Sequence, residues 1–519
     1  MENNRAPIGV AIEKNYDSEF CRSLPLHLVN LVQPHGVLLT LDSTSLHIVQ
    51  VSENAPQYLG WAVEDLLEQP LANFLPPQQL NLIQRAIAGP DNQFTNPIHL
   101  TFKSQEKEKP LSALVHPKGA YVLVELEEHT AAGGSSDSFL SLNAQIKHIT
   151  SLVKQANSVQ EFAQITAEQM KTLSGYDRVL AYQFDPQWNG IVIGQAKEED
   201  MDNYLGLRFP ASDVPRQTRE LFFKNPYRLI PTRMYKPVRL LPIVNPLTQQ
   251  FIDLSDCNLR SVAAVHLEYM GNMGIMASLS MPLIYDNKLW GLISFHHKTP
   301  KNPGHELLSA LELLTGIVSA QLAAKEKETA IVVSAKLKGI HMQLVEQLFT
   351  TPSIADGLLK GKTNLQHLLR LSGVALLFEG CIWTSGETPT NQEMKEMVFW
   401  LRRMSADALF STDTLPRLYS RAKDYSQKAS GLIVLALNQD QGEYILGFRP
   451  EVLQTIHWGG DPNQAIQMEA DGKTYHPRHS FATYQETVKH TSLPWLPEEL
   501  EAAEILRNTV LEKIQQDWY

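Results

Sequence analysis

The sequence predicts an α+β fold of three domains, in which antiparallel sheets are flanked by helices and a long helix connects two domains. Three observations support this prediction. The length of 519 residues is enough for several domains. Short apolar runs of strand length alternate with amphipathic segments. A proline-free stretch from Gly304 to Thr351 carries leucines at helical spacing.

The first domain is expected as a sheet with helical arms that ends near residue 130. Its predicted elements are strands at 37–41 and 121–126 and helices at 62–67 and 78–88. Residues 129–136 are rich in glycine, serine and alanine, which is typical of a linker.

The second domain is predicted to begin with helices and to continue as a sheet. A helical stretch from 138 to 173 is interrupted where Ser158 and Glu161 form a capping-box signature, and Gly175 is a typical helix stop. Strands are expected at 178–184, 276–285 and 289–296, with a turn at Asp286–Asn287. Residues 186–258 form a proline-rich, irregular insert, and an insert of that length is usually functional.

The proline-free stretch would make a helix on the order of 70 Å long at ~1.5 Å per residue, which exceeds what one domain requires. We expect one helix shared between domains and able to join two copies of the chain, in preference to two helices broken near Gly339. The last domain is predicted as a second sandwich with strands at 373–378 and 430–437, an irregular insertion between Phe448 and Trp495, and a final helix from Pro497 to about Gln516.

Composition and charge argue against several function classes. The chain is 43% apolar and 19% charged, as in ordinary soluble globular proteins. Its net charge of −11 argues against nucleic acid and anionic membranes as partners. We see no run of about 18 apolar residues and no secretory signal. The three cysteines, Cys21, Cys257 and Cys381, lie far apart, which argues against a disulfide scaffold or zinc site and suits the cytoplasm.

The most informative stretch is Phe209-Pro210-Ala211-Ser212-Asp213-Val214-Pro215. Its prolines lack backbone N–H groups and keep the acidic turn out of a regular helix. A stiff turn with free carbonyls suits a ligand that presents several N–H groups. Together with Leu259-Arg260-Ser261-Val262-Ala263-Ala264-Val265-His266-Leu267, this turn resembles the chromophore pocket of the phytochromes, where a linear tetrapyrrole absorbs red light.

The resemblance extends over about residues 20–515. Val32-Gln33-Pro34-His35-Gly36 matches a motif of the first phytochrome domain, and Trp458-Gly459-Gly460-Asp461-Pro462 and Pro477-Arg478-His479-Ser480-Phe481 match the tongue of the third. It implies a PAS–GAF–PHY module made of an N-terminal segment with the attachment cysteine (1–22), a PAS domain (23–130), a chromophore-binding GAF domain (131–325), a long connecting helix (304–350) and a PHY domain (351–519) with a tongue at about 448–495.

A linear tetrapyrrole needs guanidinium donors for its propionates, acceptors for its pyrrole N–H groups and apolar walls for its rings. An unmet buried N–H group costs roughly 1–3 kcal/mol. The resemblance implies that Arg228 and Arg260 hold one propionate, that Ser278 and Ser280 lie near the other, that the Asp213 carbonyl accepts from the pyrroles, that His266 and His296 lie beside the inner and outermost rings, and that Tyr182, Tyr204, Phe209 and Tyr269 form aromatic walls. It implies no catalytic residue and no metal ligand.

The attachment point is predicted at Cys21. Val265 stands where plant-type and many cyanobacterial phytochromes have their cysteine, and valine cannot form a thioether. Cys21 precedes the Gln33-Pro34-His35-Gly36 motif by a dozen residues, which is similar to the bacteriophytochromes, where biliverdin is attached covalently. A thiol near a flexible terminus is reachable and can form the nucleophilic thiolate. The family also threads this segment through the GAF insert, and Cys257 is interpreted as structural.

The resemblance also implies a signalling route in which the last ring turns by Z/E isomerisation and the tongue converts from a hairpin to a helix. In this route Asp213 pairs with Arg478 before the conversion and with Ser480 after it. The tongue sequence is ambiguous, because Phe481, Tyr484 and Val488 fall at helical spacing while its threonines favour a strand. Gly459–Gly460 would be a mobile corner, and Trp458 and Tyr484 complete the predicted relay, with Tyr484 standing where many relatives carry tryptophan.

Two other function classes are compatible with parts of the sequence. A GAF-based small-ligand regulator, such as a cyclic-nucleotide sensor, shares the fold but needs neither Cys21 nor the tongue. A triad of Asp213, His266 and Ser278 lacks a Gly-x-Ser-x-Gly elbow, and no P-loop or Rossmann fingerprint appears.

We expect this span to be no enzyme, because no ATP-binding glycine motif follows residue 496. The resemblance implies a homodimer through the long helices, a cytoplasmic location, a downstream kinase domain or response regulator outside this span, and a light-regulated histidine kinase as the full-length protein.

Overall fold

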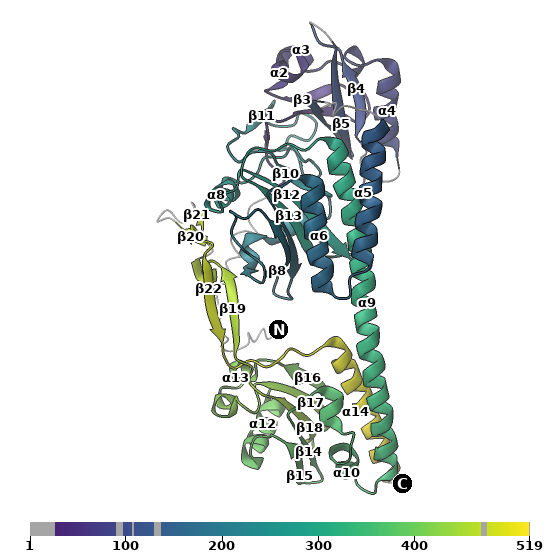
Figure 1. Cartoon of the computed structure of the whole chain (residues 1–519), viewed down its shortest axis with the longest axis vertical. Helices are drawn as coiled ribbons and strands as arrows, with labels where there is room; N and C mark the ends of the chain where they lie inside the picture. Colours follow the sequence, from purple (N-terminus) through teal and green to yellow (C-terminus); the bar gives the residue numbers. More distant parts are fainter. Residues whose placement is uncertain are drawn as a thin grey trace, which may run out of the picture. The chain divides into compact units, whose positions relative to one another are not determined.

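The computed structural model describes residues 26–89, 97–105, 108–128, 136–464, 466–468 and 475–517 (Figure 1). The chain divides into two compact units. The first comprises residues up to Ala323 together with His457–Tyr484, and the second comprises Ala324–Ile456 together with Gln485–Tyr519.

The first unit contains a seven-stranded sheet in the order β1-β11-β3-β2-β6-β5-β4. Its strands are β1 (Leu31–Val32), β2 (Val37–Asp42), β3 (Ile48–Ser52), β4 (Ile98–Phe102), β5 (Lys109–Lys118), β6 (Tyr121–Glu128) and β11 (Val238–Leu241). One face packs against α2 (Ala55–Leu59), α3 (Val63–Leu66), η2 (Leu71–Asn73) and α4 (Pro77–Ala88). Alternation along β2 sends Val37 and Leu39 into this core and Leu38 to the other face. The strands and helices predicted here are confirmed.

Strand β11 was not expected in this sheet, because it belongs to the proline-rich insert of the second domain. It pairs with β1 and β3, and Leu31 faces Arg239 in the register. On the other side, Leu28 bridges to Asp253 and Val32 to Arg260. Residues 28–32 therefore lie between β11 on one side and residues 253–260 on the other, and the threading of the N-terminal segment stays a prediction.

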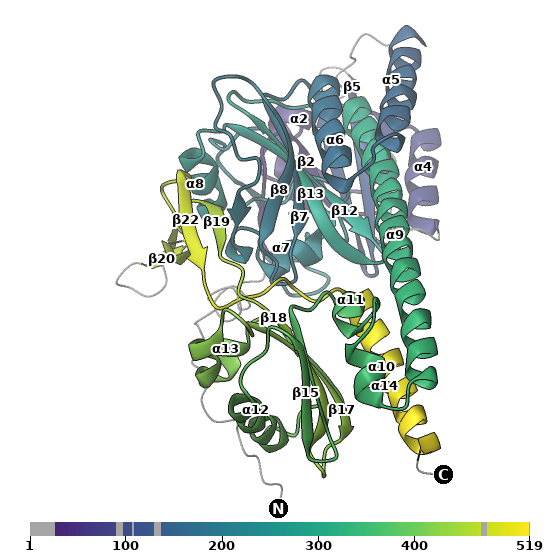
Figure 2. The ribbon, with the colours of Figure 1, turned by 60° about the horizontal axis from the view of Figure 1, so that its bottom comes forward.

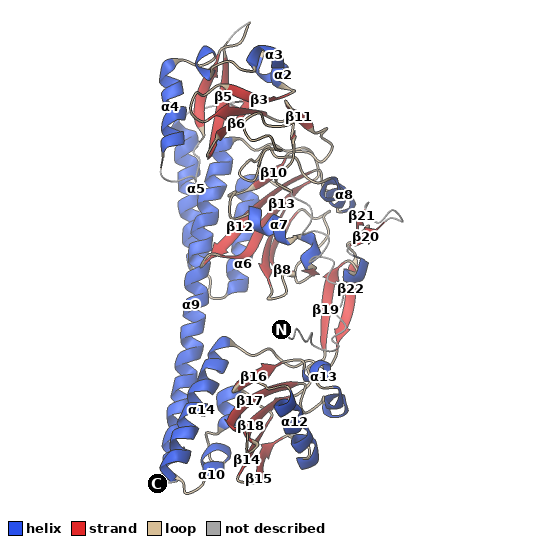
Figure 3. Cartoon of the chain, turned by 180° about the vertical axis from the view of Figure 1, so that it is seen from behind, coloured by secondary structure: helices blue, strands red, loops and turns tan. Residues whose placement is uncertain are grey.

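An eight-stranded sheet follows in the order β10-β12-β13-β7-β8-β9-β19-β22. Its strands are β7 (Arg178–Phe184), β8 (Gly190–Lys197), β9 (Arg208–Phe209), β10 (Arg228–Ile230), β12 (Ala277–Tyr285), β13 (Lys288–His297), β19 (Gln454–Gly459) and β22 (Thr483–Val488). One face is covered by α5 (Ser136–Lys154), α6 (Val159–Ser174) and the first part of α9 (His305–Thr350) (Figures 1 and 3). The other face carries η3 (Ala211–Asp213), α7 (Arg216–Leu221) and α8 (Ala264–Asn272).

Local signals explain the boundaries of these elements. The Ser158 hydroxyl accepts a hydrogen bond from the Glu161 amide at 3.1 Å, but the Glu161 carboxylate accepts from the Asn157 amide, so only half of the predicted capping box forms. Gly175 ends α6 in the left-handed region, as predicted. The prediction of an irregular insert is wrong, because residues 186–258 contain β8 to β11 together with η3 and α7. Strand β11 was hidden by its length of four residues and by the flanking Pro237 and Pro242, whereas β8, with eight residues, was missed.

Helix α9 runs without a break through 46 residues, a length of ~70 Å, so the prediction of one continuous helix is confirmed and the alternative of two helices broken near Gly339 is excluded. By composition it is also a membrane-span candidate, against our expectation, since an 18-residue window reaches a mean hydropathy of 1.6. This is weak support for a membrane location, because 44% of that window is buried and Leu308, Leu311 and Leu314 pack in the core of the second domain.

The second unit is built on a five-stranded sheet in the order β15-β14-β18-β17-β16 (Figure 2). Its strands are β14 (Gly373–Phe378), β15 (Cys381–Gly386), β16 (Leu409–Thr412), β17 (Gly431–Asn438) and β18 (Glu443–Arg449). One face packs against the end of α9 with α10 (Ile354–Leu359), α11 (Leu365–Leu369) and α14 (Pro497–Asp517). The other face packs against α12 (Asn391–Arg403), α13 (Leu415–Leu418) and η4 (Ser420–Tyr425).

The tongue is not the irregular insertion that the sequence suggested. In addition to β19 and β22 it contains η5 (Pro462–Gln464), β20 (Ile466–Met468) and β21 (Tyr475–Pro477). Tyr484 and Val488, which fall at helical spacing after Phe481, lie in strand β22. The strand-favouring threonines therefore describe this structure better than the helical spacing does.

Candidate functional site

A cavity of about 220 Å³ lies on the face of the eight-stranded sheet that carries α7 and α8. It is lined by seven of the residues predicted to bind a chromophore, namely Asp213, Arg228, Arg260, His266, Tyr269, Ser278 and Ser280. A second cavity of about 90 Å³ adds Tyr182, Phe209 and His296. The two cavities adjoin, since they share lining residues such as His266.

The turn at residues 210–215 has a non-helical backbone at both of its prolines, as the sequence predicts. Pro210 and Pro215 are both extended and bracket the short 3-10 helix η3. The Pro210 and Ala211 carbonyls accept from Asp213 and Val214, respectively. Among the described residues, no hydrogen bond reaches the Asp213 carbonyl, which leaves it available to a ligand.

Strand pairing places one arginine and two serines on the same face of the sheet. Arg228 on β10 faces Ser280 on β12, and Ser278 lies opposite Ile230, two residues further along. The Arg228 guanidinium donates to the Asn258 and Arg260 carbonyls at 2.9 and 2.5 Å. Burial and then the charge of Arg260 lower the pKa of Arg228 to about 9.

Arg260 is 6% exposed, and its Nη1 atom has no hydrogen-bond partner among the described residues. Burial lowers the pKa of Arg260 as well. Neither Arg260 nor Arg228 makes an ion pair within the part of the chain that the structure describes. A buried and a half-buried cation without an anion are costly, so this cavity is suited to receive negative charge.

Asp213 and Arg478 form the pair that the sequence predicted. The two Nη atoms of Arg478 donate to the two carboxylate oxygens at 2.8 and 2.5 Å, and the side chains are only 3% and 9% exposed. The Tyr269 hydroxyl donates to the same carboxylate at 2.7 Å. Burial acts to lower the pKa of Arg478, but the Asp213 carboxylate outweighs it and raises that pKa.

The two predicted histidines lie in different surroundings. The His266 ring stacks on Tyr269 with 5.8 Å between centroids, and burial followed by the charge of Arg228 lowers the pKa of His266 to about 4. His296 is held from behind by Arg178, which donates to its Nδ1 atom. The sequence did not identify Arg178 as a site residue, because an arginine at the start of a strand is usually exposed and its partner on the neighbouring strand was unknown.

Three of the four aromatic side chains predicted to form walls line the cavities. Tyr182 packs edge-on against Phe209 with centroids 5.7 Å apart, and Tyr269 lines both cavities. Tyr204 lines neither cavity and packs behind Phe209, with centroids 5.5 Å apart. The structure therefore gives Tyr204 a supporting position.

The glycines of the tongue allow a close approach, where the sequence suggested a mobile corner. A Cβ atom on Gly459 would lie 2.6 Å from the Phe209 ring, and one on Gly460 would lie 2.3 Å from the Ser480 carbonyl oxygen. Gly460 also has a φ of +90°, which favours glycine. Of the other predicted relay residues, Trp458 is buried and aligned with Arg208, whereas Ser480 and Tyr484 are exposed.

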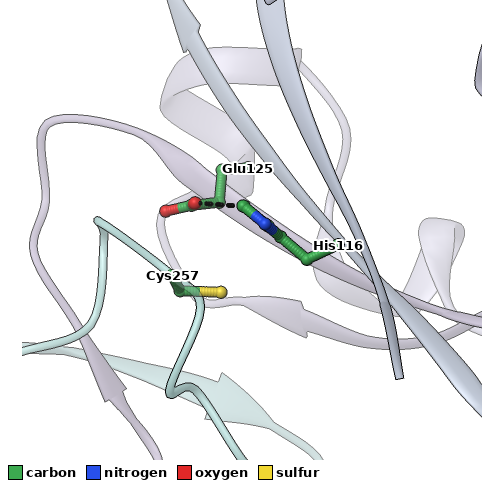
Figure 4. Close-up of side chains that lie close together, drawn as sticks. All are labelled: His116, Glu125 and Cys257. Atoms are coloured by element: carbon green, nitrogen blue, oxygen red, sulfur yellow. Dashed lines mark hydrogen bonds and ion pairs between the residues drawn. The ribbon is translucent and has the colours of Figure 1, made fainter. Parts of the chain in front are cut away.

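A separate cluster joins His116, Glu125 and Cys257, whose ligand atoms lie within 4.8 Å of one another (Figure 4). The Glu125 carboxylate accepts from the His116 ring at 2.7 Å and from the Asn258 and Leu259 amides at 3.1 and 2.5 Å. Both of its oxygens are thus in use. The cluster therefore ties the loop before Arg260 to the first sheet, and Cys257 is fully buried beside it.

Three family models match the chain. They describe a PAS fold at residues 21–129, a GAF domain at 158–325 and a phytochrome region at 337–518. Cyanobacterial phytochrome B of a Nostoc species is 37% identical over 97% of this chain and 67% of its own length. A bacteriophytochrome of Pseudomonas aeruginosa is 29% identical over 95% of this chain and 66% of its own length. The chain thus spans about two thirds of these relatives.

Solved structures agree with these matches. The phytochrome photosensory core module of Stigmatella aurantiaca superposes with a TM-score of 0.85 at 34% identity, and covers 96% of this chain and 98% of its own. A bacteriophytochrome of R. palustris has the same TM-score at 32% identity, with coverage of 96% and 99%. The chain therefore belongs to the phytochrome family of photoreceptors, and it has the PAS–GAF–PHY architecture of their photosensory modules.

Proposed function

We propose that this chain is the photosensory module of a red/far-red photoreceptor and that its pocket holds biliverdin. The observation that carries the proposal is the pair formed by the half-buried Arg228 and the buried Arg260, for which the described residues provide no anion. The two propionates of a linear tetrapyrrole would supply negative charge at this place. The free carbonyl of Asp213 is suited to the pyrrole N–H groups, and Ser278 and Ser280 to a propionate.

We further propose Cys21 as the covalent attachment point. Cys21 lies outside the described residues, but Leu26, five positions later, lines the larger cavity. Five residues span at most roughly 18 Å when extended, which is enough to reach into the pocket. The buried Cys257 is a poor competitor, because burial raises its pKa well above the usual value and disfavours the thiolate.

When bound, the pigment supplies the absorption of visible light and the isomerisable bridge before its last ring. The protein then has to convert a local change of shape into a signal. Tyr182, Tyr269 and His296 line the smaller cavity and would have to adjust to a turned ring. Tyr269 also donates to the Asp213 carboxylate, so its displacement would disturb the Asp213–Arg478 pair directly.

That pair is the proposed latch of the tongue. Arg478 contacts the rings of Phe481 and Tyr269 as well as the carboxylate, so its release would free the strand that follows. Ser480 is exposed and lies two residues away, which makes it available to replace Arg478 as the partner of Asp213. The proposal also includes refolding of the tongue to a helix and passage of the signal to an output domain. It further includes dimerisation through α9 and a cytoplasmic location.

The decisive experiment is reconstitution. Purified protein mixed with biliverdin should develop a red absorption band that shifts reversibly under red and far-red light. Cys21→Ser should retain the non-covalent pigment but lose zinc-induced fluorescence on a denaturing gel, and Cys257→Ser serves as the matched control. A protein that stays colourless overturns the proposed function, and persistent fluorescence of Cys21→Ser overturns the attachment site alone.

A further inference from the structure

Arg178 is a buried cation that the proposed light reaction leaves unused. It opens strand β7 and is 1% exposed. Its guanidinium lies 4.2 Å from the centre of the Tyr204 ring and donates to the Asp202 carbonyl at 3.2 Å. It makes no ion pair among the described residues. Burying a guanidinium without an ion pair costs free energy, so the hydrogen-bond partners of Arg178 indicate its role.

The remaining partner of Arg178 is the His296 ring. Its Nε and Nη2 atoms lie 3.2 and 3.0 Å from Nδ1 of His296. A guanidinium has five donors and no acceptor, so Nδ1 must present a lone pair to it. The proton of a neutral ring is then confined to Nε2, which lies 3.0 Å from the Ser294 hydroxyl, and both residues line the smaller cavity.

We propose that Arg178 is a positioning residue that fixes His296 in the Nε2–H tautomer and keeps its ring neutral, so that His296 always offers one hydrogen-bond donor to the smaller cavity. The Ser294 hydroxyl accepts this hydrogen bond in the present structure, and a carbonyl oxygen of a ligand in the smaller cavity would replace it. Only the identity of that carbonyl, the terminal ring of a linear tetrapyrrole, rests on the proposed function. Arg178 itself does not reach the cavity and acts through the histidine.

The surroundings of His296 favour a neutral ring from every side. Burial lowers the pKa of His296 well below its usual value, and the charge of Arg178 and the neighbouring His266 act in the same direction. The other titratable groups of the smaller cavity are Tyr182, Tyr269 and the carboxylate of Asp213, which is already paired with Arg478. An imidazolium would also turn an N–H group against the Arg178 donors.

The first test needs no pigment. In ¹⁵N-histidine-labelled protein, with His296 assigned by comparison with His296→Gln, the ring should show a bare Nδ1 and a protonated Nε2 from pH 6 to pH 9. Arg178→Gln keeps an N–H donor and should preserve this pattern. Arg178→Met removes the donor and should give mixed tautomers or titration of the ring. A protonated Nδ1 in the unsubstituted protein, or an unchanged pattern in Arg178→Met, overturns the proposal.

A second test uses the reconstituted holoprotein. Burial still lowers the pKa of His296 when Arg178 is absent, so the absorption spectrum of Arg178→Met should acquire a pH dependence below about pH 6.5, the usual pKa of histidine. This pH dependence should disappear in the Arg178→Met/His296→Gln double variant. A pH dependence that survives in the double variant contradicts the proposed route through His296. If Arg178→Met does not fold, the NMR pattern of the unsubstituted protein still tests whether His296 is the neutral Nε2–H tautomer. Failure to take up pigment would count against the proposed function but would leave the tautomer result standing.

Discussion

The Asp213–Arg478 pair gives the sharpest quantitative prediction, for the substitution Arg478→Ala. The substitution leaves the Asp213 carboxylate, whose side chain is 9% exposed, with the Tyr269 hydroxyl as its remaining side-chain donor among the described residues. Removing one partner of a buried pair costs ~3–5 kcal/mol. At ~1.4 kcal/mol per factor of ten, the docking equilibrium of the tongue should shift by roughly a hundredfold to a few thousandfold.

Hydrogen exchange reports this shift directly. Amides of residues 476–482 should exchange faster in Arg478→Ala, and thermal reversion of the illuminated state should change in rate. Arg216→Ala is the matched control, because it removes an arginine close to Asp213 in sequence whose ion pair with Glu220 is exposed. It should leave both measurements unchanged.

A double variant tests the electrostatic reasoning itself. Arg478→Ala leaves the Asp213 carboxylate buried without a cation, and Asp213→Asn removes that negative charge. The Asp213→Asn/Arg478→Ala double variant should therefore be less impaired than Arg478→Ala alone. If the two effects simply add, or if exchange in the tongue is unaffected by Arg478→Ala, the pair is not a latch.

Three further predictions follow from other residues. Arg260→Ala, compared in a Cys21→Ser background so that binding is reversible, should weaken biliverdin binding by roughly 10- to 100-fold in an absorbance titration, since one charge-assisted hydrogen bond contributes ~1.5–3 kcal/mol; equal affinity would contradict the propionate assignment. Burial and then the charge of Glu125 raise the pKa of Glu127 from 4.5 to about 8, so the stability it contributes is complete below about pH 4.5 and is lost as the pH rises through 8. Urea unfolding of Glu127→Gln should therefore depend less on pH between 5 and 8, with a gain of up to ~5 kcal/mol at high pH at ~1.36 kcal/mol per pKa unit, and an unchanged pH dependence would refute this. Gly460→Ala should loosen the tongue in limited proteolysis, whereas Gly119→Ala, also at positive φ but with nothing within 4 Å of its Cβ, should not.

The sequence could predict what depends on local signals and on strong motifs. The strand at 178–184 has the bounds of β7, and Ser158 and Gly175 mark the ends of α6 as their chemistry requires. The partnership of Asp213 with Arg478 was also accessible, because both lie in motifs that resemble the family. These features depend on few neighbours, and their residue types leave little choice.

Features that arise from long-range pairing could not be predicted in this way. The sequence of Val238–Leu241 does not indicate that this segment pairs with β1 and β3. The residues near Arg178 do not indicate that His296 on β13 lies opposite Arg178 on β7. Tyr204 is aromatic, as a pocket wall requires, but its position behind Phe209 depends on how β9 pairs with β8. The tongue was ambiguous because its residues support either a strand or a helix.

The late arrival of β11 has a consequence for biosynthesis. The Asn30 side chain donates a hydrogen bond to the Leu240 carbonyl of β11, 210 positions further along the chain. The edge of the first sheet at β3 therefore stays unpaired until β11 has been synthesised. At ~5–20 residues per second, ribosomes need on the order of 10–40 s to produce it. During that interval the nascent chain presents unpaired amides and carbonyls of β3, and any factor that shields them would raise the yield of correctly assembled receptor.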